Sequence, residues 1–236
     1  MFNDNFTLFG VSHLIILVIL LLGSFFTVLV LPKLSTTIQQ IFQKFLIVGC
    51  IAQILTFNLW HIVHNSFDIA RLLPFHLCSF SVYLIPVALL FRRDWLLKLI
   101  IFWSPISALI AIILPDMSRS DGFGSFRFLE FFWSHILIVW ASLFIISTLK
   151  PKIKYRDLWI SCAILVVSLI PVSLINWLSG GNYMYLVSRP SGGQMNFLPS
   201  EPYHIIGLMI LVNLVFHLEF AIAKLLNTSK KQTCEN

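Results

Sequence analysis

The sequence predicts an all-α fold, a polytopic bundle of seven membrane-spanning helices that forms one domain over residues 1–236. Three observations support this prediction. Hydrophobic residues make up 58% of the chain and charged residues only 11%, against the roughly 25% charged residues of soluble domains. Seven apolar segments each approach the roughly 20 residues that cross a bilayer core. Basic residues are concentrated in alternate connections between these segments, as the positive-inside rule requires.

The seven segments follow one another along the whole chain. The first lacks the basic region that precedes a signal-peptide core, so it is expected to be a retained helix. The third is short and is followed by the tight polar turn Arg92-Arg93-Asp94. The expected helices are Ser12–Leu31, Phe45–Val63, Phe75–Leu90, Trp95–Ile113, Phe128–Ser147, Trp159–Leu178 and Ile205–Ala223.

The charge distribution predicts the orientation. Of the 16 Lys and Arg residues, 12 fall in connections that the positive-inside rule assigns to the cytoplasm. The N-terminal residues 1–11 are therefore expected outside and the tail 224–236 inside, in what we expect to be a bacterial plasma membrane. The basic residues are scattered singly and form no stripe with interleaved aromatic residues, which argues against nucleic acid as a partner.

This topology collects polar groups near one face. Ionisable groups inside membrane spans are rare and each is a functional-site hypothesis by default. Cys78 is the only cysteine expected on the outer side, so it has no intrachain partner for a disulfide there. Six of the seven histidines are expected near the outer ends of their helices: His13, His61, His64, His76, His135 and His204.

Cys78 and His135 are the candidate catalytic pair. A thiol becomes a nucleophile as its thiolate, which requires a neighbouring base. Cys78 lies about five residues and His135 about seven residues into helices that run inward from the same face, so at a rise of about 1.5 Å per residue their depths agree. Equal depth allows a nucleophile and its base, with helix packing as the alternative interpretation.

Other polar residues are assigned supporting roles. Asn58, His61 and Asn65 form one stripe that either orients a catalytic imidazole or joins helices. Asn182 is a further candidate for orienting the imidazole or binding an oxyanion. His76 precedes Cys78 by two residues and points to a different side of its helix, so it is expected to support the site instead of acting as the base.

Two further hypotheses concern ligands. Arg127, Arg189 and Tyr183 are candidates for contacting a phospholipid headgroup, since arginine binds phosphate through two parallel hydrogen bonds. His61 and His64 are spaced as a pair of metal ligands that His13 or His204 would complete. Without a clear carboxylate partner, this metal site is the alternative and not the leading hypothesis.

Three motifs resemble those of the YwaF-type bacterial membrane proteins, which are related to transmembrane protein 164 of animals. They are Leu73–Ser79 (LPFHLCS), Phe131–His135 (FFWSH), and Asn182–Leu186 (NYMYL) followed by Arg189-Pro190. The animal relative is described as a cysteine-dependent acyltransferase that moves a fatty acyl chain between phospholipids. The resemblance implies that Cys78 and His135 are its catalytic cysteine and histidine.

We therefore expect an enzyme that transfers or hydrolyses the acyl ester of a membrane phospholipid without a cofactor. Cys78 is the expected nucleophile and His135 the expected base. One alternative is a metal-dependent heptahelical lipid hydrolase that uses the outer histidines. The other is a non-enzymatic transporter or receptor, which the absence of mid-span carboxylates and of a detectable repeat disfavours.

Overall fold

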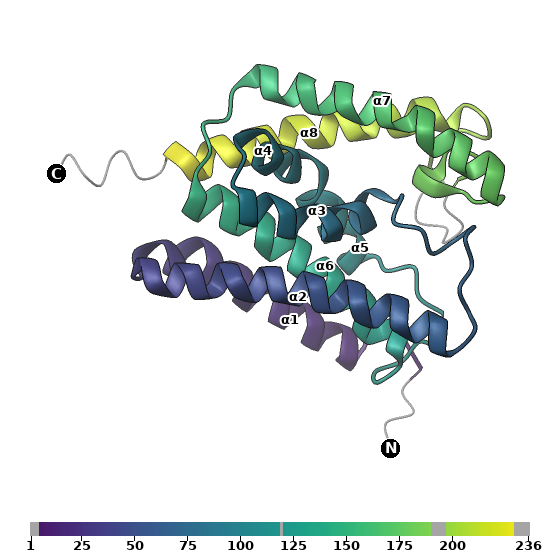
Figure 1. Ribbon diagram of the computed structural model, residues 1–236, viewed down its shortest axis with the longest axis horizontal. Helices are drawn as coiled ribbons and strands as arrows, with labels where there is room; N and C mark the ends of the chain where they lie inside the picture. Colours follow the sequence, from purple (N-terminus) through teal and green to yellow (C-terminus); the bar gives the residue numbers. More distant parts are fainter. Residues whose placement is uncertain (1–4, 119, 190–196, 229–236) are drawn as a thin grey trace.

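The computed structural model describes residues 5–118, 120–189 and 197–228 (Figure 1). Three parts of the predictions lie outside the described residues: the first residues of the N-terminal segment, Pro190 of the third motif, and 229–236 of the tail.

The described residues form helices and no strands, which confirms the predicted all-α class. The α-helices are α1 (Val11–Phe25), α2 (Thr36–Val63), α3 (Leu77–Phe91), α4 (Asp94–Trp103), α5 (Pro105–Ile113), α6 (Phe126–Phe144), α7 (Tyr155–Ser179) and α8 (His204–Thr228). Helices α1 and α6 continue into the π-helical turns η1 (Phe26–Val30) and η3 (Ile145–Leu149), and 3-10 turns occur at η2 (Leu31–Lys33) and η4 (Tyr183–Tyr185).

Six helical stretches in the described part of the chain are long and apolar enough to cross a membrane, and α3 is a shorter apolar helix. Successive passes run in opposite directions, so α1 begins and α8 ends at opposite ends of the bundle (Figure 1). This arrangement confirms the polytopic bundle. The side that faces the cytoplasm stays a prediction.

Helix α2 begins at Thr36 instead of the predicted Phe45. The Ser35 hydroxyl accepts a hydrogen bond from the Ile38 N–H at 3.5 Å, as expected of a helix N-cap. The added turns are polar and therefore lack the hydropathy that marks a span. One of their residues, Gln43, donates to the Leu89 carbonyl at the end of α3 at 2.8 Å.

The predicted helix Trp95–Ile113 is broken into α4 and α5 at Ser104. Pro105 causes the break because it has no N–H to donate to the preceding turn. The groups at the break have partners from other helices. The Ile106 N–H donates to Glu219 Oε1 on α8 at 3.2 Å, and the buried Ser104 and Ser81 hydroxyls lie 2.7 Å apart.

Helix α6 lies at the centre of the bundle and packs against α1, α2, α3 and α5. Its apolar stretch is 72% buried inside the protein, whereas that of α8 is only 11% buried. The side chains that fill the core around α6 include Phe132, Leu137 and Phe144, all of them buried. The apolar outer faces of α7 and α8 are therefore the surfaces that a bilayer would solvate.

Tyr183 holds the connection between α2 and α3. Its ring is fully buried, and its hydroxyl donates to the Ile69 carbonyl at 2.6 Å and accepts from the Leu73 N–H at 2.9 Å. Asn176 on α7 binds the Tyr183 N–H and carbonyl oxygen at 2.7 and 3.0 Å. The residues that lead into α3 are thus fastened to the connection between α7 and α8.

We expect Tyr183→Phe to loosen the segment before α3. The substitution leaves the Ile69 carbonyl and the Leu73 N–H without their partner, at a cost of about 1–3 kcal/mol. Hydrogen exchange measured by mass spectrometry should show faster exchange in peptides that cover residues 69–76. The matched control is Tyr203→Phe, because Tyr203 is exposed. Equal exchange in the two variants would contradict the role assigned to Tyr183.

Gly23 on α1 allows a close approach to α6. A Cβ atom at this position would lie 2.0 Å from Cζ2 of Trp140, whose Nε1 donates to the Leu20 carbonyl at 3.4 Å. We expect Gly23→Ala to lower the free energy of unfolding by about 1–3 kcal/mol because the indole must move.

Thermal unfolding in detergent, followed by tryptophan fluorescence, measures this effect. Leu22→Ala on the same helix is the control, since Leu22 is exposed on the outer face of the bundle. A Gly23→Ala protein as stable as the wild type would show that α1 and α6 do not approach so closely.

Candidate active site

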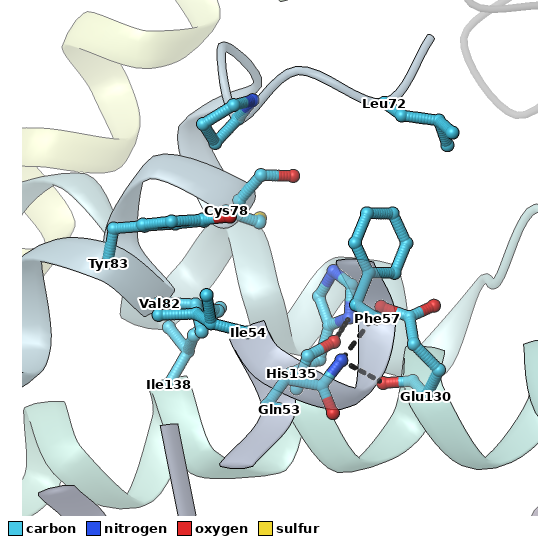
Figure 2. Close-up of a pocket in the computed structure, with 13 residues that line it drawn as sticks. Gln53, Ile54, Phe57, Leu72, Cys78, Val82, Tyr83, Glu130, His135 and Ile138 are labelled. Atoms are coloured by element: carbon cyan, nitrogen blue, oxygen red, sulfur yellow. Dashed lines mark hydrogen bonds between the residues drawn. The ribbon is translucent and has the colours of Figure 1, made fainter. Parts of the chain in front are cut away.

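Cys78 and His135 line the same pocket, which lies between α2, α3 and α6 (Figure 2). Its water-accessible volume is about 60 Å³. At roughly 10–15 Å³ for each water-sized group, this space holds only a few heavy atoms of a ligand. The two residues are 57 positions apart in the sequence, so only the packing of α3 against α6 brings them to one cavity.

Cys78 is the second residue of α3. Its thiol donates a hydrogen bond to the Ser107 hydroxyl of α5, with 3.7 Å between Sγ and Oγ. The N-cap residue of α3 is His76, and no side chain caps the helix N-terminus. Since α-helical N–H groups of the first turn have no partner within the helix, the N–H groups around Cys78 and the helix dipole favour negative charge here.

His135 lies in the middle of α6 with its imidazole held in one orientation. Nδ1 lies 2.7 Å from the Phe131 carbonyl oxygen and 3.2 Å from the Ser134 hydroxyl. A carbonyl oxygen can only accept, so Nδ1 carries a proton, and in the neutral imidazole Nε2 has the lone pair. Nε2 has no hydrogen-bond partner among the residues that the structure describes. His135 therefore presents a basic nitrogen of fixed tautomer.

The pocket is polar at one end and apolar at the other. Glu130 and Gln53 lie together, with Gln53 Nε2 donating to Glu130 Oε1 at 3.0 Å. Ile54, Val82 and Ile138 gather at the opposite end, and Cys78 and His135 lie between the two groups (Figure 2). Because His135 lies between Glu130 and Ile138 along α6, the polarity changes along the axis of that helix.

Three pocket residues, Gln53, Glu130 and Ser134, were not among the residues predicted from the sequence. Helical spacing contained a signal for two of these residues. Glu130, Ser134 and Ile138 recur at intervals of four and share one face of α6, and all three line the pocket. Gln53 carries no such signal, because its role depends on which face of α2 packs against α6.

Asn58 and His61 form no hydrogen bond with the His135 imidazole among the described residues, and Asn58 instead joins two helices, which is the alternative left open for this stripe. Asn58 Nδ2 donates to the Ile54 carbonyl at 2.8 Å and to the Tyr83 hydroxyl at 3.2 Å. His61 Nδ1 lies 2.9 Å from the Ser66 hydroxyl at the end of α2. Local hydrogen bonds therefore satisfy both side chains, and His135 is oriented by its own helix.

Asn182, a candidate for orienting the imidazole or binding an oxyanion, and Tyr183, a candidate for contacting a headgroup, both form hydrogen bonds within the protein. Asn182 Oδ1 accepts from the Val187 and Ser188 N–H groups at 3.0 and 3.1 Å, which closes the turn after η4. The Tyr183 hydroxyl is bound to the main chain before α3, as described above. The NYMYL motif thus builds the connection between α7 and α8.

His76 lies beside this connection, with its ring centroid 5.4 Å from that of Tyr183 and 5.1 Å from that of Tyr185. His76 therefore packs between the start of α3 and η4, as expected of a residue that supports the site and does not act as its base.

The two predicted headgroup arginines differ in their partners. Arg127 donates to Glu130 Oε2 at 3.2 Å and lies over the Phe131 ring, and its side chain is half exposed next to the polar end of the pocket. Arg189 binds Glu201 Oε1 through its N–H at 3.0 Å and its Nε at 3.3 Å. Hydrogen bonds from the Arg189 main chain and guanidinium hold the pKa of Glu201 at about 2, so this partner stays charged at neutral pH. Of the two arginines, Arg127 is the better placed to contact a lipid headgroup, because it lies next to the pocket.

The predicted metal ligands do not form a cluster. His13 Nε2 donates to the Ile112 carbonyl at 2.8 Å, and its Nδ1 accepts from the Phe9 N–H at 3.0 Å. His204 Nε2 donates to the Tyr185 carbonyl at 2.9 Å. Over residues 5–118, 120–189 and 197–228, no group of three or more His, Cys, Asp or Glu side chains is arranged to hold a metal ion.

Comparison with known proteins gives one family. No curated protein and no solved structure matches the chain. The model of the TMEM164 family matches residues 8–219, which include all of α1 to α7 and most of α8. This match agrees with the resemblance carried by the three motifs around Cys78, His135 and Tyr183. The chain belongs to the TMEM164 family.

Proposed function

We propose that the protein transfers or hydrolyses the acyl ester of a membrane phospholipid, with Cys78 as nucleophile and His135 as general base and acid. The observation that carries this proposal is the pocket that both side chains line. A thiol that shares a pocket with an imidazole whose Nε2 has no other hydrogen-bond partner among the described residues can supply the nucleophile and base of cysteine-dependent acyl transfer. Membership of the TMEM164 family and the acyltransferase activity implied by the resemblance support the same chemistry.

The first half of the reaction forms a thioester. His135 Nε2 takes the thiol proton while Cys78 Sγ attacks the ester carbonyl carbon, whose π electrons move to the oxygen. The tetrahedral intermediate then collapses, and the bond between the carbonyl carbon and the alcohol oxygen breaks. His135 returns its proton to the departing alkoxide, which leaves as the hydroxyl of a lysophospholipid.

The second half releases the acyl group. The hydroxyl of an acceptor lipid, or water, loses its proton to His135 Nε2 and attacks the thioester carbonyl. The bond to Sγ breaks, and the thiolate recovers the proton from His135. The acceptor alone decides between transfer and hydrolysis, and both outcomes use the same two residues.

The start of α3 supplies donors for the developing oxyanion. The N–H groups of Cys78 and Ser79 belong to the first helical turn and have no acceptor within the helix. In an environment from which water is excluded, preorganised N–H donors stabilise a tetrahedral oxyanion strongly. Cys78 would thus carry both the nucleophile and one of the donors.

The polarity of the pocket suggests how a lipid ester lies in it. The ester reacts beside Cys78 and His135, the acyl chain extends toward Ile138, and the headgroup extends toward Glu130. Arg127, one turn before Glu130 on α6, is placed to pair with the phosphate, since its guanidinium is half exposed.

Substitution of the pair tests the proposal directly. In lipid nanodiscs, Cys78→Ala should remove acyl transfer and hydrolysis, and His135→Ala should reduce the rate by about 100-fold or more because proton transfer is lost. An assay with labelled phospholipid and lysophospholipid measures both products. Mass spectrometry of the quenched wild type should detect an acyl thioester on Cys78.

Cys162→Ala is the matched control for these variants, because Cys162 lies on α7 and does not line the pocket. Full turnover by Cys78→Ala would refute the nucleophile. Loss of wild-type turnover on addition of a chelator would instead favour the metal-dependent alternative.

The Arg127 assignment has its own test. We expect Arg127→Ala to lower kcat/KM for a phospholipid by about tenfold, the effect of losing one hydrogen bond to a charged group. An uncharged acyl ester without phosphate should lose little. Arg71→Ala is the control, since Arg71 is exposed at the same end of the bundle and pairs with Asp68. An equal loss with both substrates would contradict phosphate recognition by Arg127.

A further inference from the structure

We infer that Ser107 is a positioning residue for Cys78, which orients the thiol at rest and donates a hydrogen bond to the thiolate once it forms. The inference rests on the proposed function, because it assigns a hydrogen-bond donor to the thiolate of the proposed nucleophile.

The hydrogen bonds of Ser107 define its role at rest. Its Oγ lies 3.2 Å from the Trp103 carbonyl oxygen and 3.1 Å from the Ser104 carbonyl oxygen, so its proton points toward these two acceptors. The lone pairs of Oγ are then free to accept from the Cys78 thiol at 3.7 Å. This bond turns the sulfur toward α5 and fixes the side-chain rotamer of Cys78.

Deprotonation reverses the hydrogen bond without any bond being made to Ser107. The thiol proton moves to His135 Nε2, and the sulfur becomes an acceptor. The Ser107 O–H rotates about its Cβ–Oγ bond from the carbonyl oxygens toward the thiolate, which is the stronger acceptor because it is charged. The Trp103 carbonyl oxygen, at the end of α4, then loses the Ser107 hydroxyl as a donor, and its lone pairs remain available to main-chain donors.

The break between α4 and α5 fixes Ser107 in this place. Ser107 is the third residue of α5, two residues after Pro105. Glu219 on α8 holds the N–H of Ile106, and Ser81 on α3 holds the buried hydroxyl of Ser104. In an unbroken helix the Ser107 side chain would point in another direction. The break between α4 and α5 therefore allows its hydroxyl to reach Cys78.

The test measures the thiol itself and needs no lipid turnover. The full-length protein in nanodiscs is treated with iodoacetamide over a range of pH, and alkylation of Cys78 is quantified by peptide mass spectrometry. The informative pair is Ser107→Thr and Ser107→Val, which have the same shape and differ in the hydroxyl. The titratable groups that surround Cys78 are unchanged in both variants: Tyr83 on α3, Glu130 and His135 on α6, and Tyr185 on η4.

We expect Ser107→Val to be alkylated about tenfold more slowly than the wild type at neutral pH, with its pH–rate profile displaced to higher pH. Ser107→Thr should keep the wild-type profile. Ser81→Ala is the control for loosening of the helix break, because Ser81 contacts Ser104 and forms no hydrogen bond with Cys78 among the described residues; it should also keep the profile.

Identical profiles for Ser107→Val and Ser107→Thr would overturn the inference, as would a displacement by Ser81→Ala as large as that by Ser107→Val. The proposed function fails separately, through the lipid assay of Cys78→Ala. A protein that turns over no lipid and still shows the difference between valine and threonine would retain the inference about the thiol and lose the proposed reaction.

Discussion

The backbone groups at helix ends have to be satisfied wherever water cannot reach them, and this constraint organises the bundle. Two helices begin where neighbouring helices surround their first residues: α3, which starts at the half-buried Leu77, and α5, which starts after the buried Ser104. The partners at the second start are Glu219 and Ser81, and the segment before the first is held by Tyr183. The candidate nucleophile Cys78 lies in the first turn of one of these helices, and its hydroxyl partner lies in the first turn of the other.

His135 has the opposite setting, because it lies in an uninterrupted helix at the centre of the molecule. The carbonyl oxygen that fixes its tautomer belongs to Phe131, one turn earlier on α6. A base held by its own helix needs no carboxylate partner, which explains why the polar residues predicted to orient it are engaged elsewhere. The proposed site therefore joins a helix terminus, which favours negative charge, to a rigid imidazole, which removes the proton.

Hydropathy predicted the helices well, because a bilayer requires a long apolar stretch for every crossing. The same signal ignores polar caps and breaks, so it missed the start of α2 at Thr36 and the interruption at Pro105. Depth along two helices allowed Cys78 and His135 to be a pair, with helix packing as the alternative, and did not establish that they line one pocket. Which helix faces meet was not predictable from a single sequence. The roles of Gln53 and Ser107 depend on such faces, as do the hydrogen bonds that Asn58 and His61 form with residues other than His135.

The size of the pocket limits what the proposed reaction has to enclose. The pocket is small, so a phospholipid would place its reacting ester there and extend its chain and headgroup beyond it, past Ile138 and Glu130. The wall formed by α2 and α3 reaches the perimeter of the bundle, where Tyr83 lines the pocket and is 37% exposed. The hydrogen bond from Asn58 to the Tyr83 hydroxyl joins the two helices at this wall. A lipid in the surrounding bilayer would then reach Cys78 by lateral movement in the membrane. Its chain would stay in the hydrocarbon layer and its headgroup at the interface while the ester carbonyl enters the pocket.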